Sequence, residues 1–362
     1  MRMKKLLLFA AIAAIAVSCA KTHEVNPVQG QAIGFDTWTS NLTKSTHTAF
    51  QTGATFNIYG YKQATGEEKT TVFNGEVVTL TSGGTWSYSN VRMWDRTTDS
   101  YTFYAIAPSG ITSSVNAQTG AMVTNDITFT GKNADILVAK QKTVEKTNYG
   151  KTVDLNFIPQ AALFDLKVKK AKNLKEAALR VNSISIQNIQ TKGHLTITAP
   201  YSGTDEPVAS WSLATTQATA NFDNSHGLIP VGVSAGNVAT IPVNTPHGVD
   251  NSSFLINNLI VMPQSLNLAQ KLVINYTISF SGETITHERE ILLNKFDETD
   301  MRDDKGRSEE EQNGDDTDKY YITSWLPRKH YVYYLTINAD LIVFNASISD
   351  WDDVNAFHYI IN

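Results

Sequence analysis

Alternation of apolar and polar residues with a period of two constrains the fold of this chain more than any other feature. In segment 272–280, apolar residues occupy every second position from Leu272 to Phe280, and the positions between them from 275 to 279 are polar. The pattern recurs at 56–61, 101–105, 152–157, 184–189, 195–198 and 331–337. Alternation with one polar face is typical of antiparallel strands with one side in solvent. We therefore predict an all-β protein, with Trp94, Phe103, Tyr276 and Tyr333 buried.

The composition is that of folded domains with a polar, weakly charged surface. The chain has 362 residues, of which 41% are hydrophobic, 10% aromatic and 18% charged, and its net charge is −5. An average globular chain carries about 25% charged residues, and a disordered one has few aromatics. The length leaves room for two domains, and the negative charge argues against a nucleic-acid partner. The lone cysteine, Cys19, excludes a disulfide framework and a cysteine-built zinc site.

The N-terminus has the organisation of an export signal. Positive charges within residues 2–5 precede an uncharged apolar run, 6–17, which is shorter than the about 20 residues of a membrane-spanning helix. Small residues at 16–18 precede Cys19, a pattern that resembles the lipobox of bacterial lipoproteins. That resemblance implies a signal peptide over residues 1–18, acylation of Cys19, attachment to the outer membrane through lipid, and a polar tether from residue 20. The alternative is an ordinary secretory signal with a chance cysteine.

Turn residues separate the predicted strands, and one segment has helical composition. Ser82-Gly83-Gly84 and Ser281-Gly282 are examples of such turns. Short strands divided by turns favour β-sandwiches. Segment 170–180 carries Leu174 and Ala177 at helical spacing without capping residues, so a single short helix is expected there.

An acidic segment interrupts the strand pattern at residues 297–318. Acidic residues can bind calcium, but the spacing of a calcium-binding loop, D-x-[DN]-x-[DN]-G, is absent. We expect a solvated insertion in a hairpin.

Several partial catalytic motifs are present without the context that each requires. Gly232–Gly236 matches G-x-S-x-G around Ser234, but a strand-like run ending at Pro242 follows where the motif needs a helix. His287-Glu288 begins like H-E-x-x-H, but Ile291 stands at the second histidine position. The acidic residues around Trp351 are typical of a solvated strand end. We predict no catalytic residues, no cofactor and no metal site.

A series of short segments follows in a characteristic order along the mature chain. They are Ile33-Gly34-Phe35-Asp36, Phe56–Tyr61, Trp86-Ser87-Tyr88, Tyr101–Pro108, Asp135–Ala139, Val153–Phe157, Leu259–Gln264, Trp325-Leu326-Pro327 and Ile348–Trp351. In this order they resemble the fimbrillin family of Bacteroidales, the type V pilins and their Mfa-like relatives. The chain departs from the family pattern after Phe157, where Pro159-Gln160 replaces the usual histidine.

The resemblance implies two tandem transthyretin-like Greek-key β-sandwich domains, which we place at residues 45–168 and 169–362. Residues 19–44 would be the tether and a removable first strand. In this family a trypsin-like protease cuts after a basic residue and removes that strand, and the exposed groove then accepts a strand from another pilin subunit. A sheet edge and its apolar groove are satisfied by main-chain hydrogen bonds and alternate side chains of the added strand.

Carried over to this chain, the resemblance assigns roles to particular residues. Ile33 and Phe35 would fill the groove, and the bond between Lys44 and Ser45 is the candidate cut. The C-terminal alternation of Phe357, Tyr359 and Ile361 is either the donor strand or an ordinary last strand of the second sandwich. In the second case the protein would be a tip or accessory pilin that only accepts a strand.

Two functions are in competition. The first is a fimbrial subunit for adhesion or biofilm formation, with other pilin subunits, a processing protease and a host or bacterial surface receptor as partners. The second is a glycan-binding surface lipoprotein, which would need exposed aromatic side chains. Of the six tryptophans, most match core positions of the family, and Trp211 is the best exposed candidate.

Overall fold

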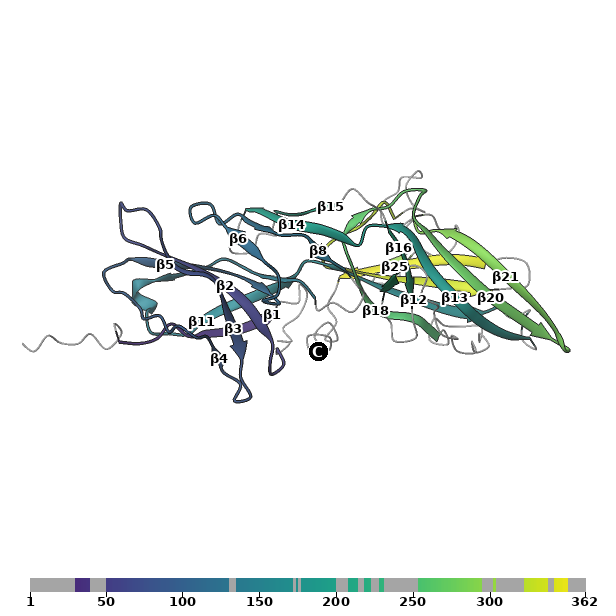
Figure 1. Cartoon of the computed structure of the whole chain (residues 1–362), viewed down its shortest axis with the longest axis horizontal. Helices are drawn as coiled ribbons and strands as arrows, with labels where there is room; N and C mark the ends of the chain where they lie inside the picture. The colour runs from purple at the N-terminus through teal and green to yellow at the C-terminus, as the bar shows by residue number, and fades with distance from the viewer. Residues whose placement is uncertain are drawn as a thin grey trace, which may run out of the picture.

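The computed structural model describes residues 30–39, 50–129, 135–171, 174, 177–199, 208–213, 218–222, 228–230, 253–294, 302–303, 322–337 and 342–350. These residues form strands almost throughout, with one short 3-10 helix at Lys146–Asn148. The all-β prediction is therefore confirmed, whereas the transthyretin-like strand order stays a prediction. In Figure 1 the molecule is elongated, with β1 to β5 and β11 in one half, β12, β13, β18, β20, β21 and β25 in the other, and β14 and β15 beside β6.

The first half is built on an eight-stranded sheet, which we call the first sheet. Its order is β1 (Phe35–Thr39), β11 (Val153–Pro159), β9 (Leu137–Ala139), β5 (Ser100–Ala107), β2 (Thr55–Gln63), β3 (Thr70–Leu80) and β4 (Trp86–Ser87), with β10 (Lys142–Glu145) beside β5. The sheet curves around a core rich in aromatic side chains, including Phe56, Phe73, Trp94, Phe103 and Phe157. Close contacts between such rings favour edge-to-face packing.

A smaller sheet covers the other face of β2 and β5. It consists of β15 (Val208–Leu213), β14 (Lys192–Ala199), β7 (Met122–Thr124) and β6 (Ser113–Val115), with β8 (Ile127–Thr128) beside β14. The hydroxyls of Tyr59 and Tyr61 donate hydrogen bonds to the backbone carbonyls of Ser113 (2.6 Å) and Val115 (3.0 Å). Both faces of β2 are therefore buried, although its alternation predicted one face in solvent.

Two further sheets lie against each other around a second core. One has the order β18 (Ser253–Val261), β12 (Ala162–Lys170), β24 (Lys329–Ile337), β25 (Ile342–Asp350) and β22 (Arg302–Asp303). The other has the order β17 (Leu228–Pro230), β16 (Ala218–Phe222), β13 (Ala178–Ile189), β20 (Lys271–Phe280) and β21 (Glu283–Leu292). A two-stranded ribbon, β19 (Gln264–Ser265) and β23 (Ser324–Trp325), adds Trp325 to this core.

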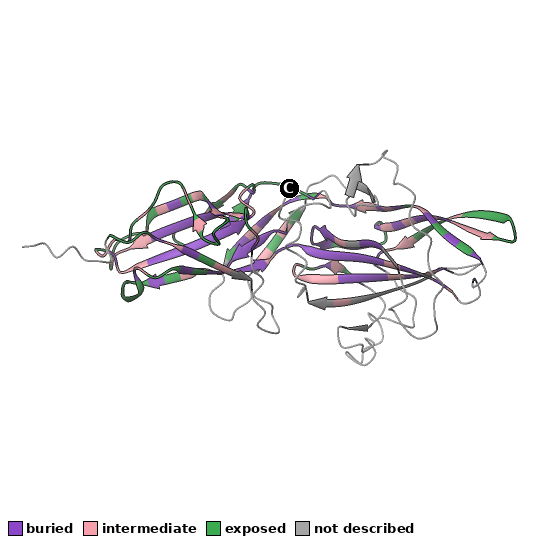
Figure 2. Cartoon of the chain, turned by 90° about the horizontal axis from the view of Figure 1, so that it is seen from below, coloured by how far each residue is buried: buried purple, intermediate pink, exposed green. Residues whose placement is uncertain are grey.

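The burial of individual residues tests the predicted strands. Trp94, Phe103, Tyr276 and Tyr333 are all buried, as predicted. Phe280 is instead 57% exposed, because β20 and β21 continue as a hairpin past the end of the second core; Figure 2 shows exposed residues at the tip of this hairpin.

In segment 170–180, Lys170 ends β12 and β13 begins at Ala178. Between them the Leu174 N–H donates to the Ala171 carbonyl and the Ala177 N–H donates to the Leu174 carbonyl (both 3.0 Å), whereas residues 172–173 and 175–176 lie outside the described residues, so the short helix stays a prediction. β12 pairs with β18 and β24 and belongs to the second core, although the predicted domain boundary at residue 168 falls within it. Among the described residues, no helix is long and apolar enough to cross a membrane.

Candidate functional site

Among the described strands, β1 lies at an edge of the first sheet and pairs with β11. The pairing is parallel and runs in register from Phe35 opposite Val153 to Thr39 opposite Phe157. Just before β1, Ala32 forms an antiparallel bridge with Met93. The Ile33 N–H donates to the carbonyl of Arg92 (2.8 Å), and the Trp94 N–H donates to the carbonyl of Gln31 (3.1 Å). Residues 31–39 thus lie between β11 on one side and segment 88–94 on the other; we call this position the β1 site.

The side chains of residues 33 and 35 anchor this segment in the first core. Ile33 is fully buried and Phe35 is 5% exposed. The Phe35 ring centroid lies 5.6–6.0 Å from four other aromatic rings, those of Phe56, Phe73, Tyr88 and Phe103. Asp36, which follows Phe35, is exposed, so alternate residues of the segment face the core and the solvent. The predicted pair Ile33 and Phe35 therefore lies together in one site.

Segment 88–94 makes side-chain contacts in addition to its backbone hydrogen bonds with residues 31–33. The Tyr88 hydroxyl donates to the Ile33 carbonyl (2.7 Å) and accepts from the Arg92 N–H (3.2 Å). The Arg92 guanidinium forms an ion pair with Glu76 of β3 (3.4 Å). The sequence does not single out Arg92 or Glu76, because their contacts join segments that are far apart along the chain. The one part of this region that the sequence does mark is Trp86-Ser87-Tyr88, which belongs to the family pattern.

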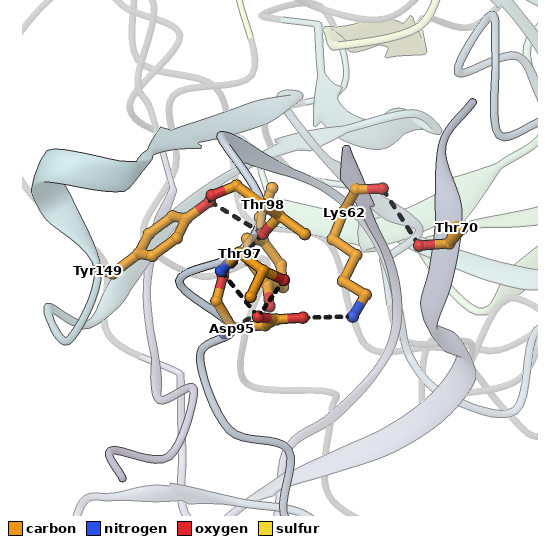
Figure 3. A network of polar contacts seen from close by, with 7 residues as sticks. Lys62, Thr70, Asp95, Thr97, Thr98 and Tyr149 are labelled. Carbon is orange, nitrogen blue, oxygen red and sulfur yellow. Dashed lines mark hydrogen bonds and ion pairs between the residues drawn. The ribbon is translucent and has the colours of Figure 1, made fainter. Parts of the chain in front are cut away.

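A polar network fixes the chain just after this segment (Figure 3). Asp95 accepts hydrogen bonds from the Lys62 ammonium (2.7 Å) and from the backbone and hydroxyl of Thr97 (2.9 and 2.6 Å). The Lys62 bond is the largest of the effects that lower the pKa of Asp95 to about 2. Beside it, the Trp94 ring stacks on Tyr149 with a centroid distance of 4.8 Å. The C-terminal end of segment 88–94 is therefore anchored to β2 through Lys62.

The other predicted site residues lie outside the described residues. They are Cys19, Lys44, Ser45, Phe357, Tyr359 and Ile361. Within the described part of the chain, no group of three or more His, Cys, Asp or Glu side chains is arranged to hold a metal ion.

The tryptophan expected to be exposed is packed. The Trp211 ring contacts Phe129 (5.4 Å between centroids), and its Nε1–H donates to the Gln160 carbonyl (2.8 Å). Trp211 is thus half-buried, and its ring packs against the first core.

These features define a class of protein: an all-β chain with two apolar cores, in which an N-terminal segment closes a sheet edge with buried side chains. A model of the fimbrillin-like family matches residues 43–351, and the chain belongs to this family.

Two further comparisons show what the chain is similar to, one in sequence and one in fold. The chain is 32% identical over 146 residues to the fimbrium subunit Fim1C of Phocaeicola vulgatus, and the match covers 37% of this chain and 36% of the relative. The matched stretch thus spans about a third of that relative. The fold is similar to the crystal structure of a fimbrial protein from Bacteroides vulgatus, with a TM-score of 0.53 and 18% identity, covering 89% of this chain and 99% of the other.

Proposed function

We propose that the protein is a fimbrial subunit that assembles by strand exchange at the β1 site. In this proposal a protease cuts between Lys44 and Ser45 and releases the segment that contains β1. A strand from another subunit then pairs with β11 and segment 88–94. Membership of the fimbrillin-like family supports the fimbrial role.

The placement of Phe35 carries the proposal. It is buried among four rings, yet its strand has main-chain pairing to only one neighbouring strand of the first sheet. An edge strand with deeply buried side chains leaves behind both an unpaired edge and uncovered apolar surface. Apolar burial contributes about 25 cal/mol per Å², so the vacated site favours any strand with matching alternate residues.

The C-terminal tail is the proposed donor. Phe357, Tyr359 and Ile361 have the same period of two as Ile33, Phe35 and Thr37. A tail that does not donate would make the protein a tip or accessory subunit, which only accepts a strand.

Delivery to the surface follows from the N-terminus. Acylation of Cys19 would hold the precursor at the outer membrane until processing releases it. Each buried CH₂ of the lipid contributes about 0.8 kcal/mol, so several acyl chains anchor stably. Adhesion to a host or bacterial surface receptor would then be the task of the assembled fimbrium. The packing of Trp211 gives no support to a glycan-binding role.

Limited trypsin treatment of the purified precursor tests the proposal. The full-length protein should form ladders of polymers on a denaturing gel after cleavage, and Lys44→Ala should form none while it stays folded. Ladders from full-length protein, but not from a chain lacking residues 352–362, would identify the tail as donor. A clean cut at Lys44 without any ladder would contradict self-assembly and favour a tip or accessory subunit.

A further inference from the structure

We propose that Arg92 is a positioning residue, which keeps segment 88–94 in the conformation that receives a strand even when the β1 site is vacant. This inference rests on the proposed function, because it concerns the same site. It assigns to one side chain the task of keeping an open sheet edge ordered.

The first group of contacts of segment 88–94 ends on the leaving strand. The carbonyl of Arg92 accepts from the Ile33 N–H, the Trp94 N–H donates to Gln31, and the Tyr88 hydroxyl donates to the Ile33 carbonyl. All three bonds disappear when residues 31–39 leave. A segment held by these bonds alone would lose its order at the moment when it has to accept a new strand.

The second group of contacts ends on β3, which stays in place. The Nε–H of Arg92 donates to the Val72 carbonyl (3.2 Å), and its terminal nitrogen lies 3.4 Å from a carboxylate oxygen of Glu76. The guanidinium carbon lies 5.9 Å from the centroid of the Phe73 ring. β3 is paired on both sides, with β2 and with β4, so these contacts do not depend on β1.

The segment is also tied to itself through the same side chain. A terminal N–H of Arg92 donates to the Asn90 carbonyl (2.6 Å), and the Asn90 N–H donates to the other oxygen of Glu76 (3.1 Å). Arg92 and Glu76 together therefore hold the backbone at Asn90, two residues before the Arg92 carbonyl that accepts from the Ile33 N–H. The planar guanidinium makes these contacts simultaneously, which a lysine ammonium does not reproduce.

This arrangement affects the rate of strand capture more than the rate of strand loss. Ordering a backbone residue has a substantial entropic cost, and a pre-ordered edge removes that cost from the encounter with the incoming strand. Once a strand is bound, its own hydrogen bonds order segment 88–94 whether or not Arg92 is present. Loss of Arg92 should therefore slow association and leave dissociation nearly unchanged.

The test uses the full chain with a site for a sequence-specific protease inserted between Lys44 and Ser45. After cleavage, the released segment is removed by size-exclusion chromatography. The probe is a fluorescent peptide of residues 30–39, and its association and dissociation rates are followed by anisotropy. Arg92→Gln is compared with the wild type and with Arg289→Gln. Arg289 is a matched control, since it is an exposed arginine of β21 with a local contact to the Glu288 carbonyl.

Arg92→Gln should lower the association rate on the order of tenfold, from the entropy of re-ordering the edge, and Arg289→Gln should not. Equal association rates in all three proteins, or a change in the dissociation rate alone, would overturn the inference. If Arg92→Gln does not fold, Arg92→Lys and Glu76→Ala are judged by the same criterion. If the cleaved wild type stays folded but binds no peptide, the proposed strand exchange itself is overturned. In that case Arg289→Gln should also bind no peptide.

Discussion

The Nε2 atom of His330 lies 2.9 Å from Oδ2 of Asp165, and this contact joins β24 to β12 in a nearly water-free position. The side chains are 13% and 4% exposed, and the second oxygen of Asp165 accepts from the Asn258 N–H of β18. Asp165 therefore links three adjacent strands of one second-core sheet. A buried carboxylate that loses a partner keeps its desolvation cost without compensation.

Replacing His330 should accordingly destabilise the protein. We expect His330→Phe to lower the free energy of unfolding by about 1–3 kcal/mol. His194→Phe is the matched control, because His194 faces Asp126 at 3.5 Å with both side chains at least 40% exposed, and exposed pairs contribute about 0–1 kcal/mol. Urea denaturation at pH 7 measures both. Equal losses of unfolding free energy in His330→Phe and His194→Phe would show that burial does not strengthen the contact between Asp165 and His330.

Phe35→Ala should loosen β1. Truncation of a buried phenylalanine costs about 3–5 kcal/mol, and the four surrounding rings would lose their common partner. Asp36→Ala is the control in the same strand, since the Asp36 side chain is exposed and accepts a hydrogen bond from the adjacent Thr37 N–H. Chymotrypsin digestion should cut the N-terminal segment of Phe35→Ala faster than that of the wild type or of Asp36→Ala. Identical digestion rates would mean that Phe35 does not hold the strand.

Asp135 should make the protein less stable as the pH rises. It is 1% exposed, and burial raises its pKa well above the ordinary value, against a smaller lowering by the backbone N–H of Ile136. The unfolded state ionises at about pH 4, so above that pH ionisation favours unfolding until the raised folded pKa is reached. Asp135→Asn should be more stable than the wild type at pH 7 and approach it near pH 4. A pH-independent difference would contradict this.

Asp95 should have the opposite dependence. Its pKa is lowered to about 2, chiefly by the Lys62 ammonium, so the ionised form stabilises the folded state. This stabilisation is complete above the unfolded pKa of about 4 and is lost as the pH falls through about 2. Asp95→Asn should therefore be less stable than the wild type at pH 7, and thermal denaturation curves of the two should converge as the pH falls from 4 to 2. If the two denaturation curves are still separate at pH 2, the stability difference does not come from ionisation of Asp95.

The proposed lipid anchor is tested by replacing Cys19. Cys19 is the only thiol of the chain, so Cys19→Ala should abolish labelling by a fatty-acid analogue and move the protein to the soluble fraction. Cys19→Ser is a second variant of similar size. Unchanged membrane fractionation of both variants would refute lipid attachment through this residue.

The sequence predicts strands well where one sheet face alone determines burial. Leu272, Ile274 and Tyr276 are buried because the facing sheet covers this part of β20. Phe280 continues the same alternation but lies beyond the facing sheet, and local periodicity carries no information on where that sheet ends. Tyr59 and Tyr61 are the opposite case, because they are buried on the face of β2 that the alternation predicted to be in solvent. Their hydroxyls donate hydrogen bonds to residues of β6 more than fifty positions away.

The candidate site is predictable only in part for a similar reason. Ile33 and Phe35 stand out in an apolar alternation and in the family pattern. Arg92 carries no such signal, because a surface arginine and an arginine that ties two segments together look alike in sequence. Its contacts with Val72 and Glu76 exist only after β3 has folded back against segment 88–94.

The parallel pairing of β1 with β11 has a consequence for biosynthesis. Phe35 leaves the ribosome early, whereas its backbone neighbour Val153 is made much later, so the first strand of the sheet in sequence is among the last to find its place. During that interval every new chain passes through a form whose sheet edge is open. The folding polypeptide therefore meets the same choice between its own strand and a foreign one that the proposed assembly assigns to the subunit after cleavage.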